Sequence, residues 1–416
     1  MKQDLPKNKR TGLAIGAVLF AALILLLAVA VFIPEPQSNL SDSDQSRDAT
    51  DEAGADPVTG GGPSLKQDHT SSSKEEASMP HIQPDPACLA AIDRALAELG
   101  QAKSPAEAAG ILRQLRESLL RAQEQVAAAA IVAFLQTGKD APTGLPFDVG
   151  SEGILDSSPS LRVMLLDLLP SLDPYASVDV ARQIIAEGRS QDEYAMALRN
   201  LSWNDLDGDM ALELTDGFSR MLAREDWRLN PSAGFLEGFD IAVEVGGAQM
   251  LDRVAAVITP DRANASAQAK AVDRAAFIAL DRIVLRDPSV LVDKFSENPA
   301  FLGNATRQRA SLMSRLDIED PAQRETFVRY LESSTHGEGE LEYFSRLFPN
   351  GNYLHGHRLA SEDEITPTID QRQEMDRKAL AVIKGLESKL TTGPARQAAA
   401  EITRRLEGFV NPPPRQ

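Results

Sequence analysis

The sequence is poor in the residues that build cross-links and metal sites, with one cysteine and five histidines among 416 residues. A single cysteine has no partner in its own chain, so no intrachain disulfide can form, and the cysteine count fits either redox compartment. Cys88 also lacks the small and apolar residues that precede a lipoprotein cleavage site. We therefore interpret Cys88 as a small buried residue of the first helix of the folded part.

Basic side chains are also scarce, with 43 Lys and Arg against 61 Asp and Glu and a formal net charge of -18. An acidic protein repels phosphate backbones, because like charges raise the free energy of association. The composition therefore predicts no nucleic-acid partner.

Recognisable catalytic and cofactor motifs are absent: the sequence contains no G-x-S-x-G, Walker loop, dinucleotide fingerprint or H-E-x-x-H. Asp205–Asp209 is similar to the start of a calcium loop, which needs glycine at position six and glutamate at position twelve. Those positions hold Met210 and Asp216, so we interpret the segment as a polar turn that caps the next helix. We therefore predict no cofactor and no catalytic residue.

One long apolar run is present near the N-terminus, from Leu13 to Ile33, and residues 11–33 carry no charge. About twenty helical residues cross the hydrocarbon core of a bilayer, so this run is long enough to span it. Residues 1–10 carry four basic side chains and one acidic one, and Glu35 follows the run. The positive-inside rule then predicts a cytoplasmic basic tail at 1–10 and a single-pass signal-anchor helix at 11–33, with the rest of the chain extracytoplasmic.

A cleaved signal peptide is the competing interpretation, because Ala28 and Ala30 form an A-x-A cleavage pattern. The apolar run continues through Val31–Ile33 and exceeds the usual length of a signal-peptide core, which favours the uncleaved anchor. Cleavage after Ala30 would instead release the folded part.

Residues 34–85 are rich in Ser, Asp, Glu, Gly and Pro and carry three basic and eleven acidic side chains. Such a segment buries too little apolar surface to offset the entropy of ordering it. We predict a disordered acidic stalk at 34–85 and a short disordered tail at 411–416.

Ten dipeptides beyond the stalk pair a helix-capping residue with proline. The capping side chain accepts a hydrogen bond from the first helical turn, where proline loses no bond. Apolar residues at helical spacing follow most of these dipeptides, so the sequence predicts an all-helical fold. The dipeptides are Asp85-Pro86, Ser104-Pro105, Ser158-Pro159, Asp173-Pro174, Asn230-Pro231, Thr259-Pro260, Asp287-Pro288, Asn298-Pro299, Asp320-Pro321 and Thr366-Pro367.

The sequence thus predicts an extracytoplasmic helical domain at 86–410, with a sub-boundary considered near 138–158. Gly138, Gly188 and Gly393 lie where C-terminal caps are expected, and Ser104 with Glu107 forms the pattern of a capping box. The expected helices are 86–99, 105–121, 123–136, 159–171, 174–187, 191–201, 209–223, 233–245, 248–258, 263–286, 300–315, 321–333, 368–390 and 395–408.

Residues 159–187 form a helical pair joined by the turn at Asp173-Pro174, with Arg162 near the start of its first helix. This pair resembles a HEAT-type helical hairpin. The other pairs lack a fixed period near forty residues, so the resemblance implies an irregular α-solenoid or a helical bundle rather than a regular array. The layout of anchor, stalk and helices is also similar to that of single-pass bacterial envelope proteins.

Two long segments interrupt the expected helices, at 138–158 and 334–366. The first has apolar anchors and is expected to pack on the domain. The second contains His336, His355 and His357, and imidazole with nearby carboxylates suits zinc or acid–base chemistry. The ligand spacing is not that of a known zinc site, so these histidines are metal candidates only under the alternative hypothesis.

The leading hypothesis is a non-enzymatic scaffold, held to the bacterial inner membrane, whose periplasmic helical domain binds another envelope protein. Its partners are the lipid bilayer, through residues 11–33, and that unidentified protein. The alternative is a metal-binding or hydrolytic enzyme organised by the histidine-rich segment 334–366.

Overall fold

The computed structural model describes residues 83–205, 210–259, 264–352, 354, 356–361 and 366–410. By its internal contacts the chain divides into two units, Met1–Ala77 and Ser78–Gln416, and all the described residues belong to the second unit. The predicted anchor at 11–33, the stalk up to residue 82 and the tail at 411–416 lie outside the described residues. Within the described part, no helix is both long and apolar enough to cross a membrane.

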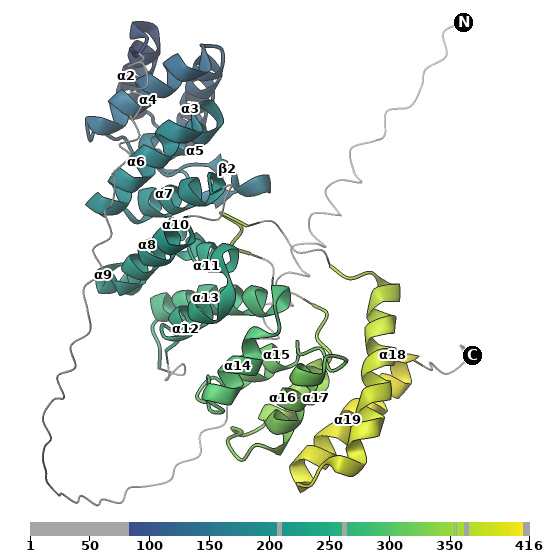
Figure 1. Ribbon diagram of the computed structural model, residues 1–416. Helices are drawn as coiled ribbons and strands as arrows, with labels where there is room; N and C mark the ends of the chain where they lie inside the picture. Colours follow the sequence, from purple (N-terminus) through teal and green to yellow (C-terminus); the bar gives the residue numbers. More distant parts are fainter. Residues whose placement is uncertain are drawn as a thin grey trace, which may run out of the picture. The chain divides into compact units, whose positions relative to one another are not determined.

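The described part is all-helical, as predicted (Figure 1). The short strands β1 (Asp148–Val149) and β2 (Leu155–Ser157) pair antiparallel and are the only strands among the described residues. The α-helices are α2 Pro86–Leu99, α3 Pro105–Leu120, α4 Glu124–Gln136, α5 Leu161–Leu172, α6 Pro174–Glu187, α7 Gln191–Trp203, α8 Ala211–Ala223, α9 Glu225–Leu229, α10 Ala233–Glu237, α11 Asp240–Val245, α12 Gly247–Ala255, α13 Ala267–Arg286, α14 Val290–Glu297, α15 Thr306–Met313, α16 Pro321–Glu332, α17 Glu340–Leu347, α18 Ile369–Leu386 and α19 Gly393–Val410; the short 3-10 helices are η1 Ser151–Gly153 and η2 Glu387–Lys389.

Four of the predicted proline starts are confirmed: Asp85, Ser104, Asp173 and Asp320 cap α2, α3, α6 and α16, each with proline in the first helical turn. At three other dipeptides the helix begins later than predicted, because a downstream hydroxyl provides the cap: Ser160 for α5, Ser266 for α13 and Thr368 for α18. After Asn230-Pro231, α10 begins at residue 233 as predicted, with Ser232 as its cap.

Two further cap predictions are only partly right. Ser104 accepts from the amide of Glu107 at 3.2 Å, but the Glu107 carboxylate accepts from the amide of Lys103 instead of returning to Ser104. Gly188 ends α6 in the left-handed region, at φ 55°, as expected for a C-cap glycine. Gly393 is the first residue of α19, so its predicted role as a C-cap is wrong.

The helix boundaries differ most where helices are short. The expected helix 233–245 is two helices, α10 and α11, and the segment 334–366, expected to be a loop, contains α17. Helix α14 was not predicted at all. Short helices have little intrinsic stability and depend on tertiary packing, and each of these buries apolar side chains, such as Phe344 in α17 and Phe295 in α14.

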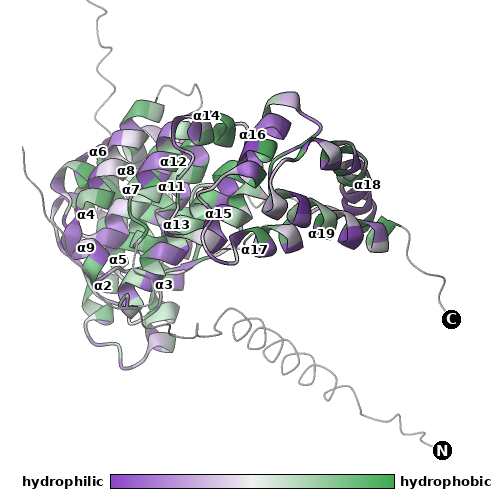
Figure 2. Ribbon diagram, turned by 90° about the horizontal axis from the view of Figure 1, so that it is seen from below, coloured by the Kyte–Doolittle hydropathy of each residue, from purple (hydrophilic) through white to green (hydrophobic). Residues whose placement is uncertain are grey.

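Helices contact mainly their neighbours in the sequence, either the next helix or the one after it. The contacts α11–α13, α13–α15 and α15–α17 form one row, and the contacts α12–α14 and α14–α16 form a second row. The same alternation joins α5 to both α6 and α7. Hydrophobic residues gather on central helices such as α11 and α13, and the buried apolar side chains form one continuous cluster (Figure 2).

Candidate functional site

The structure places His336 and His357 in separate surroundings, and His355 lies outside the described residues. His336 lies edge-on to the ring of Tyr330, whereas the Nδ1 atom of His357 lies 3.2 Å from Glu237 in α10. No group of three or more His, Cys, Asp and Glu side chains that could hold a metal exists within the described ranges.

His336 belongs to a partly buried cluster at the end of α16. Glu340, at the start of α17, accepts from the Tyr330 hydroxyl at 2.9 Å and from the amide of Gly337 at 2.9 Å. Arg309 lies 3.4 Å from the same carboxylate and donates to the backbone of Pro299 and Thr335. Burial, and then the nearby Glu340 carboxylate, raise the pKa of Tyr330 well above its ordinary value. These groups hold the start of the 334–366 segment in place.

Burial lowers the pKa of His336 below its ordinary value, and this effect outweighs the opposing influence of Glu340. A histidine with a lowered folded-state pKa binds its proton more readily when unfolded, so the folded state loses stability as the pH falls below the unfolded value. We expect the stability of the wild type to fall as the pH drops below about 6.5, the ordinary pKa of histidine, and His336→Gln to flatten that fall. Urea unfolding at several pH values, with His69→Gln as the control, measures the difference; parallel curves for the wild type and His336→Gln would show that His336 has no such role.

The later part of the same segment is held by buried arginines. Arg315 donates to both oxygens of Asp281, at 2.7 and 2.6 Å, and to the carbonyl oxygens of Asn350 and Asn352, at 3.2 and 2.5 Å. Arg282 donates to Asp240 at 2.6 Å and to the carbonyl oxygen of His357 at 2.5 Å. The guanidinium groups of Arg315 and Arg282 therefore bind backbone carbonyl oxygens of this segment.

Asp240, the first residue of α11, uses both carboxylate oxygens. Oδ1 accepts from Arg282 and from the Ser361 hydroxyl at 2.6 Å, while Oδ2 accepts from the amides of Ala360 and Ser361, both at 2.8 Å. Burial raises the pKa of Asp240, and the positive charge of Arg282 and the bonds from Ser361 and Ala360 act against it. Ser361 is buried and donates its hydroxyl hydrogen to Asp240.

The first long segment, 138–158, is held in the same way. Arg199 in α7 is fully buried and donates to Asp167 in α5 at 2.7 Å and to the carbonyl oxygen of Gly153 at 2.9 Å. Its guanidinium lies 4.0 Å above the ring of Trp203. Asp167 also accepts from the amide of Leu155 at 3.2 Å. The prediction that this segment packs on the domain agrees with these contacts.

Three buried pairs of this kind follow one another along the helices: Asp167 with Arg199, Asp240 with Arg282, and Asp281 with Arg315. We call them the Asp–Arg series. In each pair the aspartate precedes the arginine by about one helical repeat, and the arginine then reaches a carbonyl of a long segment. Sequence reasoning missed these residues; the available signal was a charge inside an apolar helical run, as in Ala195–Leu201 and Ala279–Val284.

The two long segments meet each other. A Cβ atom added to Gly153 would lie 2.5 Å from the carbonyl oxygen of Leu359 and 2.7 Å from the ring of Trp203, which is closer than real contacts allow. Gly153 also has a φ of +70°, a conformation that suits glycine. Only glycine therefore fits at position 153, where the two segments meet.

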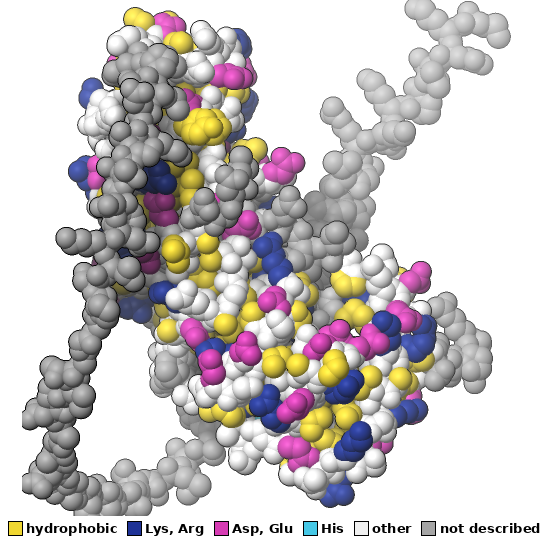
Figure 3. Space-filling view, in the orientation of Figure 1, with side chains coloured by type: hydrophobic (Ala, Val, Ile, Leu, Met, Phe, Trp, Pro, Cys, Tyr) yellow, Lys and Arg dark blue, Asp and Glu magenta, His cyan; other side chains and the backbone are white. Residues whose placement is uncertain are grey.

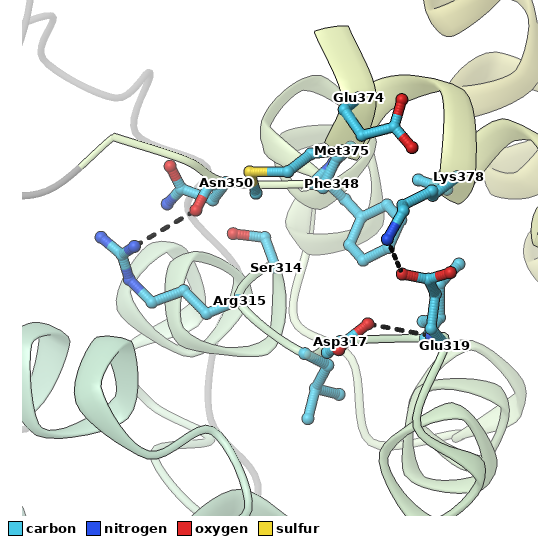
Figure 4. A pocket seen from close by; sticks show the side chains of 13 residues that line it. Ser314, Arg315, Asp317, Glu319, Phe348, Asn350, Glu374, Met375 and Lys378 are labelled. Carbon is cyan, nitrogen blue, oxygen red and sulfur yellow. Dashed lines mark hydrogen bonds and ion pairs between the residues drawn. The ribbon is translucent and has the colours of Figure 1, made fainter. Parts of the chain in front are cut away.

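Described residues of the 334–366 segment also line two surface hollows. One, of about 530 Å³, lies between α17 and the start of α19 and is lined by His336, Glu340, Ser345 and Arg346, among others. The other, of about 290 Å³, lies between the α15–α16 turn, Asn350 and α18 (Figure 4).

The basic side chains of the second hollow are already paired. Lys378 donates to Glu319 at 2.8 Å, and Arg315 is bound to Asp281 and Asn350. The Ser314 hydroxyl donates to a carbonyl of its own helix. No nucleophile among its described lining residues has a base to activate it.

No protein-family model, curated protein or solved structure matches this chain. Its function is therefore argued from the arrangement of its own residues.

Proposed function

We propose that this chain is a membrane-anchored scaffold whose extracytoplasmic helical domain binds another protein of the cell envelope. Residues 11–33 would form the single-pass anchor, with 1–10 in the cytoplasm and 34–85 as the stalk. The folded part would lie in the periplasm of a bacterial cell. A tether of this kind raises the local concentration of a binding surface, so that modest affinity is sufficient.

The observation that carries the proposal is the pattern of helix contacts. Helices that contact the next helix and the one after it form two rows, which is the arrangement of stacked helical hairpins. The Asp–Arg series repeats along these helices. This repetition favours a HEAT-like, irregular α-solenoid rather than a bundle, because in a bundle helices far apart in the sequence share one core. Such arrays provide extended surfaces for protein partners.

The surface properties agree with this function. On the face seen in Figure 3, Lys and Arg side chains alternate with Asp and Glu, and hydrophobic side chains lie between them. Three large apolar side chains on the described surface are more than 70% exposed: Tyr175 in α6, Leu212 in α8 and Ile369 in α18. A mixed surface with exposed apolar side chains is typical of protein-binding faces.

Site-specific photo-crosslinking in cells tests the proposal. A photoreactive residue replaces Tyr175, Leu212 or Ile369, one position at a time. We expect one envelope protein to be crosslinked from the positions on the binding face and not from the remaining positions. The control places the photoreactive residue in the predicted stalk, at Ser72. Recovery of uncrosslinked chain from every position on the helical domain would contradict a protein-binding role.

A further inference from the structure

Residues 350–352 and 356–361, which we call the strap, run back along the helices that precede them. In chain order the strap contacts Arg315 after α15, then Arg282 in α13 and Asp240 in α11. The amide of Arg358 also donates to Glu237 in α10, at 3.3 Å. From residue 350 to residue 358 its path therefore passes α15, α13 and α10 in the reverse of their sequence order, and residues 360 and 361 then contact α11.

The strap also reaches the segment before α5, where Leu359 meets Gly153. Residues 359 and 153 are far apart in sequence, and the bonds between Asp240 and residues 360 and 361 span 120 and 121 positions. Stacked helical hairpins otherwise contact only near neighbours, so each hairpin can shift relative to more distant ones. In this chain α7 also contacts α10 and α11 directly, and the strap adds connections that reach further, from Arg315 after α15 to the segment before α5.

We propose that the strap is a conformational clamp that holds the α5–α7 part and the α11–α15 part of the domain in one fixed arrangement. Its attachments are mostly hydrogen bonds between its backbone and side chains of the helices: arginines donate to its carbonyl oxygens, and its amides donate to carboxylates. Leu359 is a fully buried apolar anchor. Released from them, the two parts move relative to each other. The clamp acts in the same way whether or not the chain is attached to a membrane.

The backbone of the strap is itself constrained. His357 has a φ of +53°, in the left-handed region that a residue with a side chain rarely adopts. Such a conformation persists only where surrounding contacts impose it. Here the contacts are the bond from Arg282 to the His357 carbonyl and the bond from the Arg358 amide to Glu237.

Two glycines of the segment 138–158 provide a matched pair of variants. Gly153 and Gly144 both have a φ of +70°, so alanine strains the backbone equally at each position. At position 153 the new methyl group collides with Leu359 and Trp203, whereas at position 144 its nearest neighbour is Pro105 at 3.9 Å. Gly153→Ala should therefore displace the strap, and Gly144→Ala should leave it in place.

The test is made on the full chain. Spin labels at Tyr175→Cys in α6 and Asp293→Cys in α14, both exposed positions, report the distance between the two parts, and Cys88 is buried. We expect a narrow distance distribution in the wild type and in Gly144→Ala, and a broad one in Gly153→Ala. Hydrogen exchange of the Ala360 and Ser361 amides should become about tenfold faster or more in Gly153→Ala.

Ser361→Ala is the second variant, because it removes the hydroxyl that joins Asp240 and Arg282 without adding any atoms. It should also speed exchange of the strap amides and broaden the distance distribution. The clamp is overturned if the folded Gly153→Ala and Ser361→Ala proteins both keep the narrow distribution of Gly144→Ala. It is equally overturned if exchange at residues 360 and 361 accelerates while the distance between the labels stays narrow.

Discussion

Asp240→Ala is expected to lower the free energy of unfolding by about 3–5 kcal/mol, the usual cost of removing one member of a buried ion pair. The substitution removes the carboxylate that lies 2.6 Å from Arg282, whose side chain is buried. It also removes the acceptor for the amides of Ala360 and Ser361. Urea unfolding followed by circular dichroism measures the change.

The matched control is Glu213→Ala, which removes the carboxylate of a more exposed pair with Arg182. Surface pairs of this kind contribute less than about 1 kcal/mol, because water and ions screen them. A loss in Asp240→Ala as small as that in Glu213→Ala would show that the Asp240 network does not stabilise the fold. Asp240→Asn, which keeps one acceptor oxygen but no charge, should lie between the two.

The double substitution Leu25→Arg and Leu26→Arg is expected to move the chain from the membrane fraction to the soluble fraction. Each arginine near the centre of a spanning helix costs about 2.5–3.5 kcal/mol, so two of them make insertion of residues 11–33 unfavourable. Fractionation of cells followed by detection of the full chain measures the result.

The control for this experiment is Leu25→Ile with Leu26→Ile, which keeps the apolar character and should stay in the membrane fraction. Retention of the double-arginine variant in membranes would mean that residues 11–33 are not the anchor. The intact mass of the wild-type chain distinguishes the uncleaved anchor from the cleaved signal peptide. A mature chain that begins after Ala30 is a cleaved and released domain.

The Asp–Arg series holds the described parts of the two long segments on the helices. Arg199, Arg282 and Arg315 each satisfy one aspartate and at least one backbone carbonyl. Buried ion pairs often add little net stability, because desolvation offsets their attraction. Here the pairs position the chain, because the fixed geometry of each guanidinium holds the segment that it binds in one conformation.

Helical structure was predicted well because its signals are local. The predicted helix 174–187 coincides with α6, and the predicted helices 105–121 and 321–333 each extend one residue beyond α3 and α16. In all three, an aspartate or serine accepts from an amide of the first turn and proline follows it. These interactions join residues three or four positions apart, so the sequence alone contains them.

The sequence by itself thus determined the helical class, most helix starts with a local cap, and the acidic composition. Only the tertiary structure decided that α17 forms within 334–366, where Phe344 packs against Phe327 and Tyr330. Only the tertiary structure placed Gly153 next to Leu359 and Asp240 next to Ser361. The physical reason is distance along the chain: contacts between residues more than a hundred positions apart form because the folded helices bring them together, and no local pattern of residues encodes that.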